Sequence, residues 1–286
     1  MKFLDIKTDF AFKKVFGSED SKERLISFLN SIVYADESEK IIDLTILDPY
    51  NIPKLKGMKD TYVDVKAKLD NDTKVIIEMQ ILPHEGLEKR ILYNMAKNYS
   101  SQLVKGDKYQ LLNPVIALTI VNFTMFDDLS SCVSRFKLLE KTKFTDYSDD
   151  FELIFVELPK FNKELNELVN IEDEWIWFVK NAGSLECIPS EMSPSVKDAL
   201  ETANEANMSE EELELQKQKK DFIYIQDASI SLALKKGLEK GREEGKKEAM
   251  VEMAISLLDL LDDEMIASKT KLTIQEVRTL RKSSTS

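Results

Sequence analysis

The stretch YVDVKAKLDNDTKVIIEMQI, residues 62–81, reads as two β-strands joined by a polar turn. Successive side chains of a strand point to opposite faces of its sheet. The apolar residues of the first strand therefore share one face: Val63, Val65, Ala67 and Leu69. On the second strand, Ile76, Glu78 and Gln80 share a face. We expect Asp64 to look across the hairpin toward Glu78, with Gln80 beside it.

Two carboxylates at such positions repel each other, which raises a pKa unless a cation lies between them. Mg²⁺ suits that place because it takes hard oxygen ligands, such as one or two carboxylates, water and substrate phosphate. An ion held there activates water and stabilises charge on a phosphodiester. The other interpretation is acids on a solvent-facing surface, paired with Lys66 or Lys68 across the sheet. Glu78 lies inside the apolar run VIIEMQI, where a buried carboxylate needs a partner or a metal.

The surrounding patterns predict the other elements. Thr8 or Asp9 caps a short helix that Gly17 ends, and apolar residues at helical spacing predict a second helix through Ile32. A third helix is expected over residues 85–105, with Gly106 as its stop. The nearly continuous apolar run at 114–123 predicts a central strand buried on both faces, and residues 151–161 predict another strand. This order favours an α/β sandwich around a mixed β-sheet flanked by helices.

Beyond about residue 162 the chain becomes helical and rich in charge. We expect a core domain over residues 1–200 and a charged helical tail over 201–286 with a small helical C-terminal element. Gly237, Gly241 and Gly245 repeat every four residues, as in a solvated connector or in a close helix–helix contact.

The last segment shows a capping-box pattern in Thr273 and Glu276. One interpretation of this segment is a helix-turn-helix with Arg278, Arg281 and Lys282 near nucleic acid. The other is a small packing or oligomerisation element.

Composition limits the class of protein. The chain has 286 residues, two cysteines and a net charge of −12, with no signal peptide and no apolar run near 18 residues. We therefore expect a soluble, cytoplasmic protein that does not act at a membrane. The acidic balance counts against a protein whose main task is binding a nucleic-acid backbone. A nuclease stays compatible with it, because bound Mg²⁺ cancels the charge of site carboxylates.

Several motifs together resemble those of a known family. They are DFAFKKVFG (9–17), LISFLN (25–30), DVKAKLDNDTKVIIEMQ (64–80), Arg90 and Tyr93 in an R-x-x-Y helix, GDKY (106–109), VELPKF (156–161) and the glycine-spaced tail. In this combination the chain resembles the PD-(D/E)XK nuclease superfamily, in its transposase-like branch of recombination-promoting nucleases. The resemblance runs over most of residues 1 to about 250.

The resemblance implies a restriction-endonuclease-like α/β core and Mg²⁺- or Mn²⁺-dependent hydrolysis of double-stranded DNA. Asp64 and Glu78 would be metal ligands, with the backbone carbonyl of Met79 and Asp9 as further ligands. Asp9 is equally compatible with an N-cap role. Gln80 stands in place of the superfamily's usual lysine, so it orients water without supplying a positive charge.

The same reading assigns further roles. Lys59, Lys66, Arg90 and Tyr93 are candidates for binding DNA phosphate, although Arg90 could equally pair with a local glutamate. A homodimer through the C-terminal helices is a further expectation. The competing function is a catalytically degenerate nuclease fold that serves as a binding or regulatory module and assembles through its helical tail.

Overall fold

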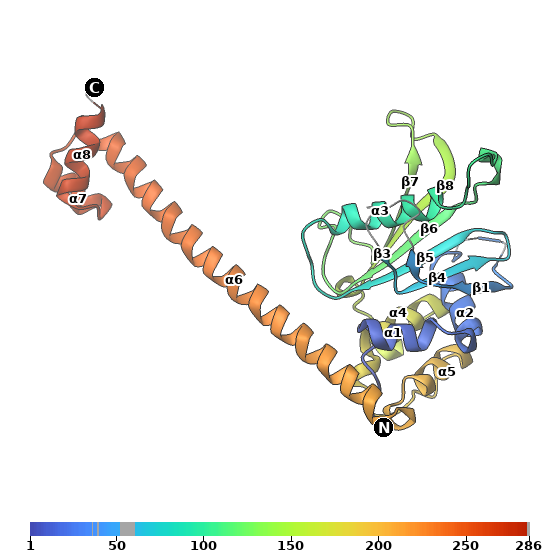
Figure 1. Ribbon diagram of the computed structural model, residues 1–286. Helices are drawn as coiled ribbons and strands as arrows, with labels where there is room; N and C mark the ends of the chain where they lie inside the picture. Colours follow the sequence, from blue (N-terminus) through green and yellow to red (C-terminus); the bar gives the residue numbers. More distant parts are fainter. Residues whose placement is uncertain (36, 39, 52–60, 285–286) are drawn as a thin grey trace. The chain divides into compact units, whose positions relative to one another are not determined.

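A computed structural model describes residues 1–35, 37–38, 40–51 and 61–284 (Figure 1). The chain divides into two compact units, Met1–Ile223 and Tyr224–Ser286. In the part of the chain so described, no helix is long and apolar enough to cross a membrane.

The first unit is built on a six-stranded mixed sheet, which confirms the predicted fold class. Its strand order is β1-β4-β5-β6-β8-β7. The strands are β1 (Leu44–Leu47), β4 (Val65–Leu69), β5 (Lys74–Gln80), β6 (Val115–Val121), β8 (Asp146–Glu157) and β7 (Val133–Leu139). The three strands β5, β6 and β8 run parallel to one another. The pairs β1–β4, β4–β5 and β7–β8 are antiparallel. A separate two-stranded ribbon joins β2 (Tyr50–Asn51) to β3 (Thr61–Tyr62).

The N-terminal helices follow the predicted signals. Helix α1 (Asp9–Phe16) begins after Thr8, whose side chain accepts a hydrogen bond from the backbone of Ala11, and ends at Gly17. Helix α2 (Lys22–Ile32) buries the predicted apolar stripe of Leu25, Phe28, Leu29 and Ile32. Thr8 and not Asp9 is therefore the N-cap residue.

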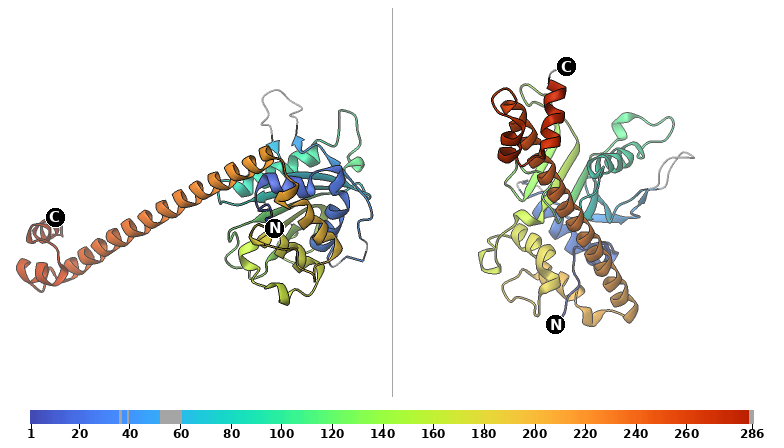
Figure 2. Two further views of the ribbon diagram at one scale, coloured as in Figure 1. Left: turned by 90° about the horizontal axis from the view of Figure 1, so that it is seen from below. Right: turned by 90° about the vertical axis from the view of Figure 1, so that its left-hand side faces the viewer.

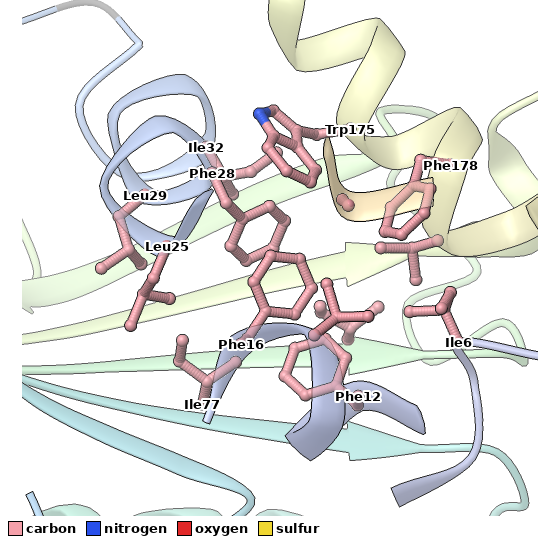
Figure 3. Close-up of a cluster of buried hydrophobic side chains, with 14 of the residues drawn as sticks. Ile6, Phe12, Phe16, Leu25, Phe28, Leu29, Ile32, Ile77, Trp175 and Phe178 are labelled. Atoms are coloured by element: carbon pink, nitrogen blue, oxygen red, sulfur yellow. The ribbon is translucent and has the colours of Figure 1, made fainter. Parts of the chain in front are cut away.

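One face of the sheet carries the main hydrophobic core. Helices α1 and α2, together with α4 (Ile171–Asn181) and α5 (Pro194–Thr202), cover this face (Figures 1 and 2). Figure 3 shows the aromatic side chains of these helices packed together above the strands. Trp175 is fully buried and contacts Phe16, Phe28 and Phe178. This face contributes most of the apolar burial that stabilises the unit.

The opposite face is covered by α3 (Leu87–Ser100) and carries a smaller core. Leu87, Ile91 and Met95 of α3 pack there on Ile76 and on the central strands. The helix is shorter than the predicted 85–105. It ends at Ser100, and Gly106 lies beyond it in a loop with φ of 101°. Strand β6 is buried along its whole length, as predicted.

The predicted alternation of the first strand is wrong at its start. Regular pairing of β4 with β5 begins only at Val65, which lies opposite Ile77. Val63 packs in the core under α3, whereas Val65 packs in the core under α1 and α2. The chain bends at Asp64 between them, so this residue is not part of the regular strand.

Beyond residue 162 the chain is helical, as predicted. The helix α6 runs from Glu210 to Leu257. Its early residues belong to the first unit, where the Thr8 hydroxyl donates to Gln216 at 2.8 Å. The division at residue 200 stays a prediction. The second unit contains the rest of α6 with α7 (Asp263–Thr270) and α8 (Ile274–Ser284).

Candidate active site

Glu78 lies near the end of β5 and points to the α3 face of the sheet. Its side chain is held by two residues of α3: Asn94 Nδ2 donates to Oε1 at 2.5 Å, and Arg90 Nη2 donates to Oε2 at 3.0 Å. The residue is only 6% exposed. Both carboxylate oxygens are thus paired, one with an amide and one with a cation, as a buried carboxylate requires.

Asp64 lies at the bend that precedes β4. Its backbone N–H donates to the carbonyl of Ile77, and its Oδ2 accepts the backbone N–H of Met79 at 2.8 Å. The Asp64 carboxylate thereby accepts the Met79 N–H in place of a backbone carbonyl of a neighbouring strand. Lys13 of α1 lies 3.2 Å from Oδ1. Asp64 is consequently held at the plane of the sheet, next to the position of Glu78, and does not project from the face as the regular alternation predicted.

Burial raises the pKa of both carboxyl groups above the ordinary range. For Asp64, burial outweighs the hydrogen bond from Met79 and the nearby charge of Lys13, which lower the pKa. For Glu78, burial outweighs Asn94 and Arg90, and the negative charge of Asp64 raises the pKa further. The two acids are therefore electrostatically coupled, and a cation bound between them would relieve the repulsion.

Gln80 lies at the end of β5, two residues after Glu78 on the same face. Its Oε1 accepts a hydrogen bond from Arg90 Nη2 at 2.8 Å, and its Nε2 donates to the carbonyl of Leu82 at 2.9 Å. One guanidinium nitrogen therefore contacts both Glu78 and Gln80. This nitrogen holds the two side chains together at the carboxyl end of the strand.

Arg90 and Tyr93 line a pocket of about 560 Å³ together with Tyr62, Lys89 and Asn94. Arg90 forms the local glutamate pair that the sequence left as one of two alternatives. Its Nε is buried and has no hydrogen-bond partner among the described residues. Since Arg90 and Asn94 also hold Glu78, the pocket opens directly beside the buried carboxylate.

The remaining predicted site residues are more dispersed. Asp9 is the first residue of α1, and its Oδ2 lies 3.2 Å from Lys219 Nζ. Its charge reaches Asp64, whose pKa it raises. Lys66 of β4 is half-buried, and burial lowers its pKa, with Lys97 adding repulsion. Lys59 lies outside the described residues.

Sequence reasoning missed two partners of the acids, Lys13 and Asn94. Asn94 lies one helical turn after Arg90, and Lys13 one turn after Asp9, so each follows a residue that the motifs singled out. The four-residue spacing indicates that Asn94 and Lys13 lie on the same helix faces as Arg90 and Asp9. The sequence does not show which acid each of them contacts, because that depends on how the helices pack on the sheet.

The donor chemistry fits a hard divalent cation. Asp64 and Glu78 offer carboxylate oxygens, the ligand type that suits Mg²⁺ and Mn²⁺. The N–H of Met79 points toward Asp64, and the carbonyl of an extended residue points to the same side as its N–H. Over the described ranges no group of three or more His, Cys, Asp or Glu side chains could hold a metal ion. Water or phosphate oxygen would therefore complete the coordination.

Comparison with known proteins gives the family. No curated protein and no solved structure matches the chain. The sequence model described as PD-(D/E)XK nuclease family transposase matches residues 6–233. This match covers most of the chain, including every residue of the site described above, and the protein therefore belongs to the PD-(D/E)XK nuclease family transposases.

Proposed function

We propose that the protein is a Mg²⁺- or Mn²⁺-dependent endonuclease that hydrolyses phosphodiester bonds of double-stranded DNA. The observation that carries this proposal is that two carboxylates meet at strand β5: the partly buried Asp64 accepts the backbone N–H of Met79, and the buried Glu78, the preceding residue, is held by Arg90 and Asn94, which line the pocket. Lys13 and Arg90 offset part of the negative charge of the two acids, and a divalent cation bound between them would relieve the remaining repulsion.

Each residue has a role in the proposed reaction. Asp64, Glu78 and the Met79 carbonyl would hold the ion, and Asp9 would contact it through water. When bound, the ion would supply stabilisation of negative charge on the phosphate and activation of water. Gln80 orients the water for in-line attack on phosphorus.

Phosphate binding is assigned to the pocket. Arg90 is a candidate because its side chain lines the pocket and is 41% exposed, so its guanidinium could bind a phosphate oxygen. Tyr93 lies beside it in the same pocket and would donate a hydrogen bond. Lys66 and Lys59 would add positive charge along the backbone of the substrate. Arg90, Lys66 and Lys59 would thereby supply the positive charge that the neutral side chain of Gln80 cannot.

A role in promoting recombination of DNA rests on family membership alone. A cytoplasmic location rests on the composition of the sequence. A homodimer through the C-terminal helices belongs to the same proposal, and an added Cβ at Gly237, Gly241 or Gly245 would meet no described atom within 4 Å. That open helix face is available to a partner helix. A specific activity that rises with protein concentration would support assembly.

Cleavage of supercoiled plasmid tests the activity. Wild type, Asp64→Ala and Glu78→Gln are incubated with Mg²⁺, Mn²⁺ or EDTA. The matched control is Asp149→Ala, an exposed acid near the start of β8 and thus at the other end of the parallel strands. We expect metal-dependent nicking by wild type and control, and its loss in both site variants, with melting curves showing that all four proteins are folded.

The competing function is a binding or regulatory module on a degenerate nuclease fold. Absence of cleavage by folded wild type in either metal would favour it, as would full cleavage by Asp64→Ala. Metal titration separates the two further. A competent site gains thermal stability as metal binds the native state, whereas a degenerate site shows little shift. The presence of both Asp64 and Glu78 argues for the enzyme.

A further inference from the structure

The second unit ends in two short helices joined by a tight turn. Three residues, 271–273, separate α7 from α8. Lys271 ends α7 in a left-handed conformation, with φ of 64°. Two helices joined by a turn of three or four residues form the helix-turn-helix of DNA-binding proteins, in which the second helix enters the major groove. The length of the turn thus matches the helix-turn-helix interpretation that the sequence left open.

The two helices lie against the end of α6 (Figure 2), and a small apolar core holds them there. Its buried members are Ala254, Leu258, Ile266, Leu272 and Val277. Arg281 of α8 is fastened to the same place: its guanidinium donates to the carbonyls of Leu258 and Leu261 and to Asp263. Arg281 therefore has a structural role and is not an exposed contact for nucleic acid.

The opposite side of α8 faces solvent. Gln275, Arg278, Thr279 and Lys282 recur at i, i+3, i+4 and i+7 and so form one helix face, which we call the outer face of α8. All four side chains are exposed. Arg278 is 64% exposed and lies 3.5 Å from Asp263, an exposed contact of the kind that contributes little. Its guanidinium can therefore turn to another anion.

The acids near this face are held away from it or are engaged. Residues 262–284 contain five Lys and Arg and four acids; of these acids, Asp263 contacts Arg278 and Arg281. Glu276 is engaged at the start of α8, where its carboxylate accepts hydrogen bonds from the backbone N–H and the hydroxyl of Thr273. The outer face itself carries no acid. Lys269 and Lys271, both exposed, extend the positive charge through the turn.

The side chains on the outer face are those that read DNA. Glutamine bonds bidentately to adenine and arginine to guanine, and threonine contacts the thymine methyl or a base edge. Lysine binds phosphate. We propose that α7 and α8 are a second DNA-binding site, a helix-turn-helix that places the outer face of α8 in the major groove of double-stranded DNA. The family match ends at residue 233 and does not include these helices.

Binding of the full chain to a fluorescent 30-base-pair duplex of mixed sequence tests the proposal. Anisotropy is measured in EDTA over a range of salt, so the result does not depend on cleavage or on the proposed nuclease. The test variant is Arg278→Ala/Lys282→Ala. The control is Lys235→Ala/Lys236→Ala, which removes the same charge from exposed positions of α6. Melting curves verify that both variants are folded.

We expect the test variant to bind about tenfold or more weakly and its salt slope to fall by about one for each lost phosphate contact. The control should retain both the affinity and the slope of wild type. Equal losses in the two variants would overturn the proposal, because they would show only a general effect of charge. Unchanged binding by the test variant, or no binding by wild type, would also overturn it.

A selection from random duplexes examines base reading. Wild type should enrich a sequence motif that Gln275→Ala/Thr279→Ala fails to enrich, although the charge is unchanged. Sedimentation of the same variants tests the alternative that a second copy of the chain, and not DNA, binds this face. A change of oligomeric state in Arg278→Ala/Lys282→Ala without a change in DNA binding would make the face an assembly interface and refute the DNA site.

Discussion

The two faces of the central sheet in the first unit differ in what covers them and in what they bury. Four helices cover one face and enclose an almost wholly apolar core of aromatic and aliphatic side chains. The helix α3 covers the other, and beneath it lie Glu78, Asn94, Asn98 and Lys97, all buried. The apolar core therefore lies on one face of the sheet and the buried polar side chains around Glu78 on the other, whereas Asp64, beside β5, is reached by Lys13 of α1 from the core side.

Strand β5 contributes side chains to both faces of the sheet. Ile77 and Met79 point into the large core, whereas Ile76 and Glu78 point to α3. The apolar neighbours anchor the strand, so that Glu78 is held in place by residues that take no part in its chemistry. Substitutions on the two faces should therefore have different consequences.

The largest expected effect on stability is in the four-helix core. Trp175→Ala removes a fully buried indole and its hydrogen bond to the Ser27 hydroxyl. We expect it to lower the free energy of unfolding by about 3–5 kcal/mol, measured by chemical denaturation. Phe144→Ala, at a side chain that is 71% exposed, should change it by less than about 0.5 kcal/mol. A similar small change in Trp175→Ala would contradict the packing described.

A smaller effect is expected under α3. Asn94→Leu removes the amide that donates to Glu78 and leaves a buried oxygen without this partner. The expected loss is about 1–3 kcal/mol in the free energy of unfolding. The double variant Asn94→Leu/Glu78→Leu should lose less than the sum of the single changes, because both partners are removed together. Strict additivity in this cycle would show that the hydrogen bond contributes nothing.

The raised pKa values predict a dependence on pH in the absence of metal. A carboxyl whose pKa is higher in the folded than in the unfolded state keeps its proton longer when folded. The contribution of these two groups to stability should therefore decrease as pH rises from about 4, the ordinary pKa of such acids, through their raised pKa values, and it is measured as the difference between wild type and the double variant Asp64→Asn/Glu78→Gln. Asp64→Asn/Glu78→Gln should flatten this part of the curve, measured by denaturation in EDTA.

The control for that curve is Asp149→Asn, an exposed acid that should leave the slope unchanged. Added Mg²⁺ should restore stability to wild type most strongly at the higher pH, because metal binds the deprotonated ligands. A difference between wild type and Asp64→Asn/Glu78→Gln that grows in favour of wild type as pH rises would contradict the direction of both pKa shifts.

The smallest effect is expected on the outer surface of α3. Leu92 is 52% exposed, so Leu92→Ala should change the free energy of unfolding by no more than about 0.5 kcal/mol. Cleavage should also persist, since Leu92 contacts none of the site residues described. A loss above about 1 kcal/mol would mean that this surface is covered in solution.

Local patterns predicted much of the first unit. The cap at Thr8, the stripe of α2 and the burial of β6 each depend on residues close together in the chain. The predicted alternation of the first strand was wrong where the chain departs from regular strand geometry. Val63 and Val65 lie on different faces because the chain bends at Asp64, and a strict alternation cannot anticipate a bend. It also extended α3 to residue 105, although the helix ends at Ser100.

Strand alternation and apolar runs are local properties, and they predicted the mixed sheet and pointed to Asp64 and Glu78 as candidate metal ligands. The surroundings of these acids depend instead on how helices distant in the chain pack against the sheet. Arg90 and Asn94 reach Glu78 because α3 packs across β5, and Lys13 reaches Asp64 because α1 packs on the other side. Burial and partners come from elements distant in the chain, and these set the pKa of each carboxyl group.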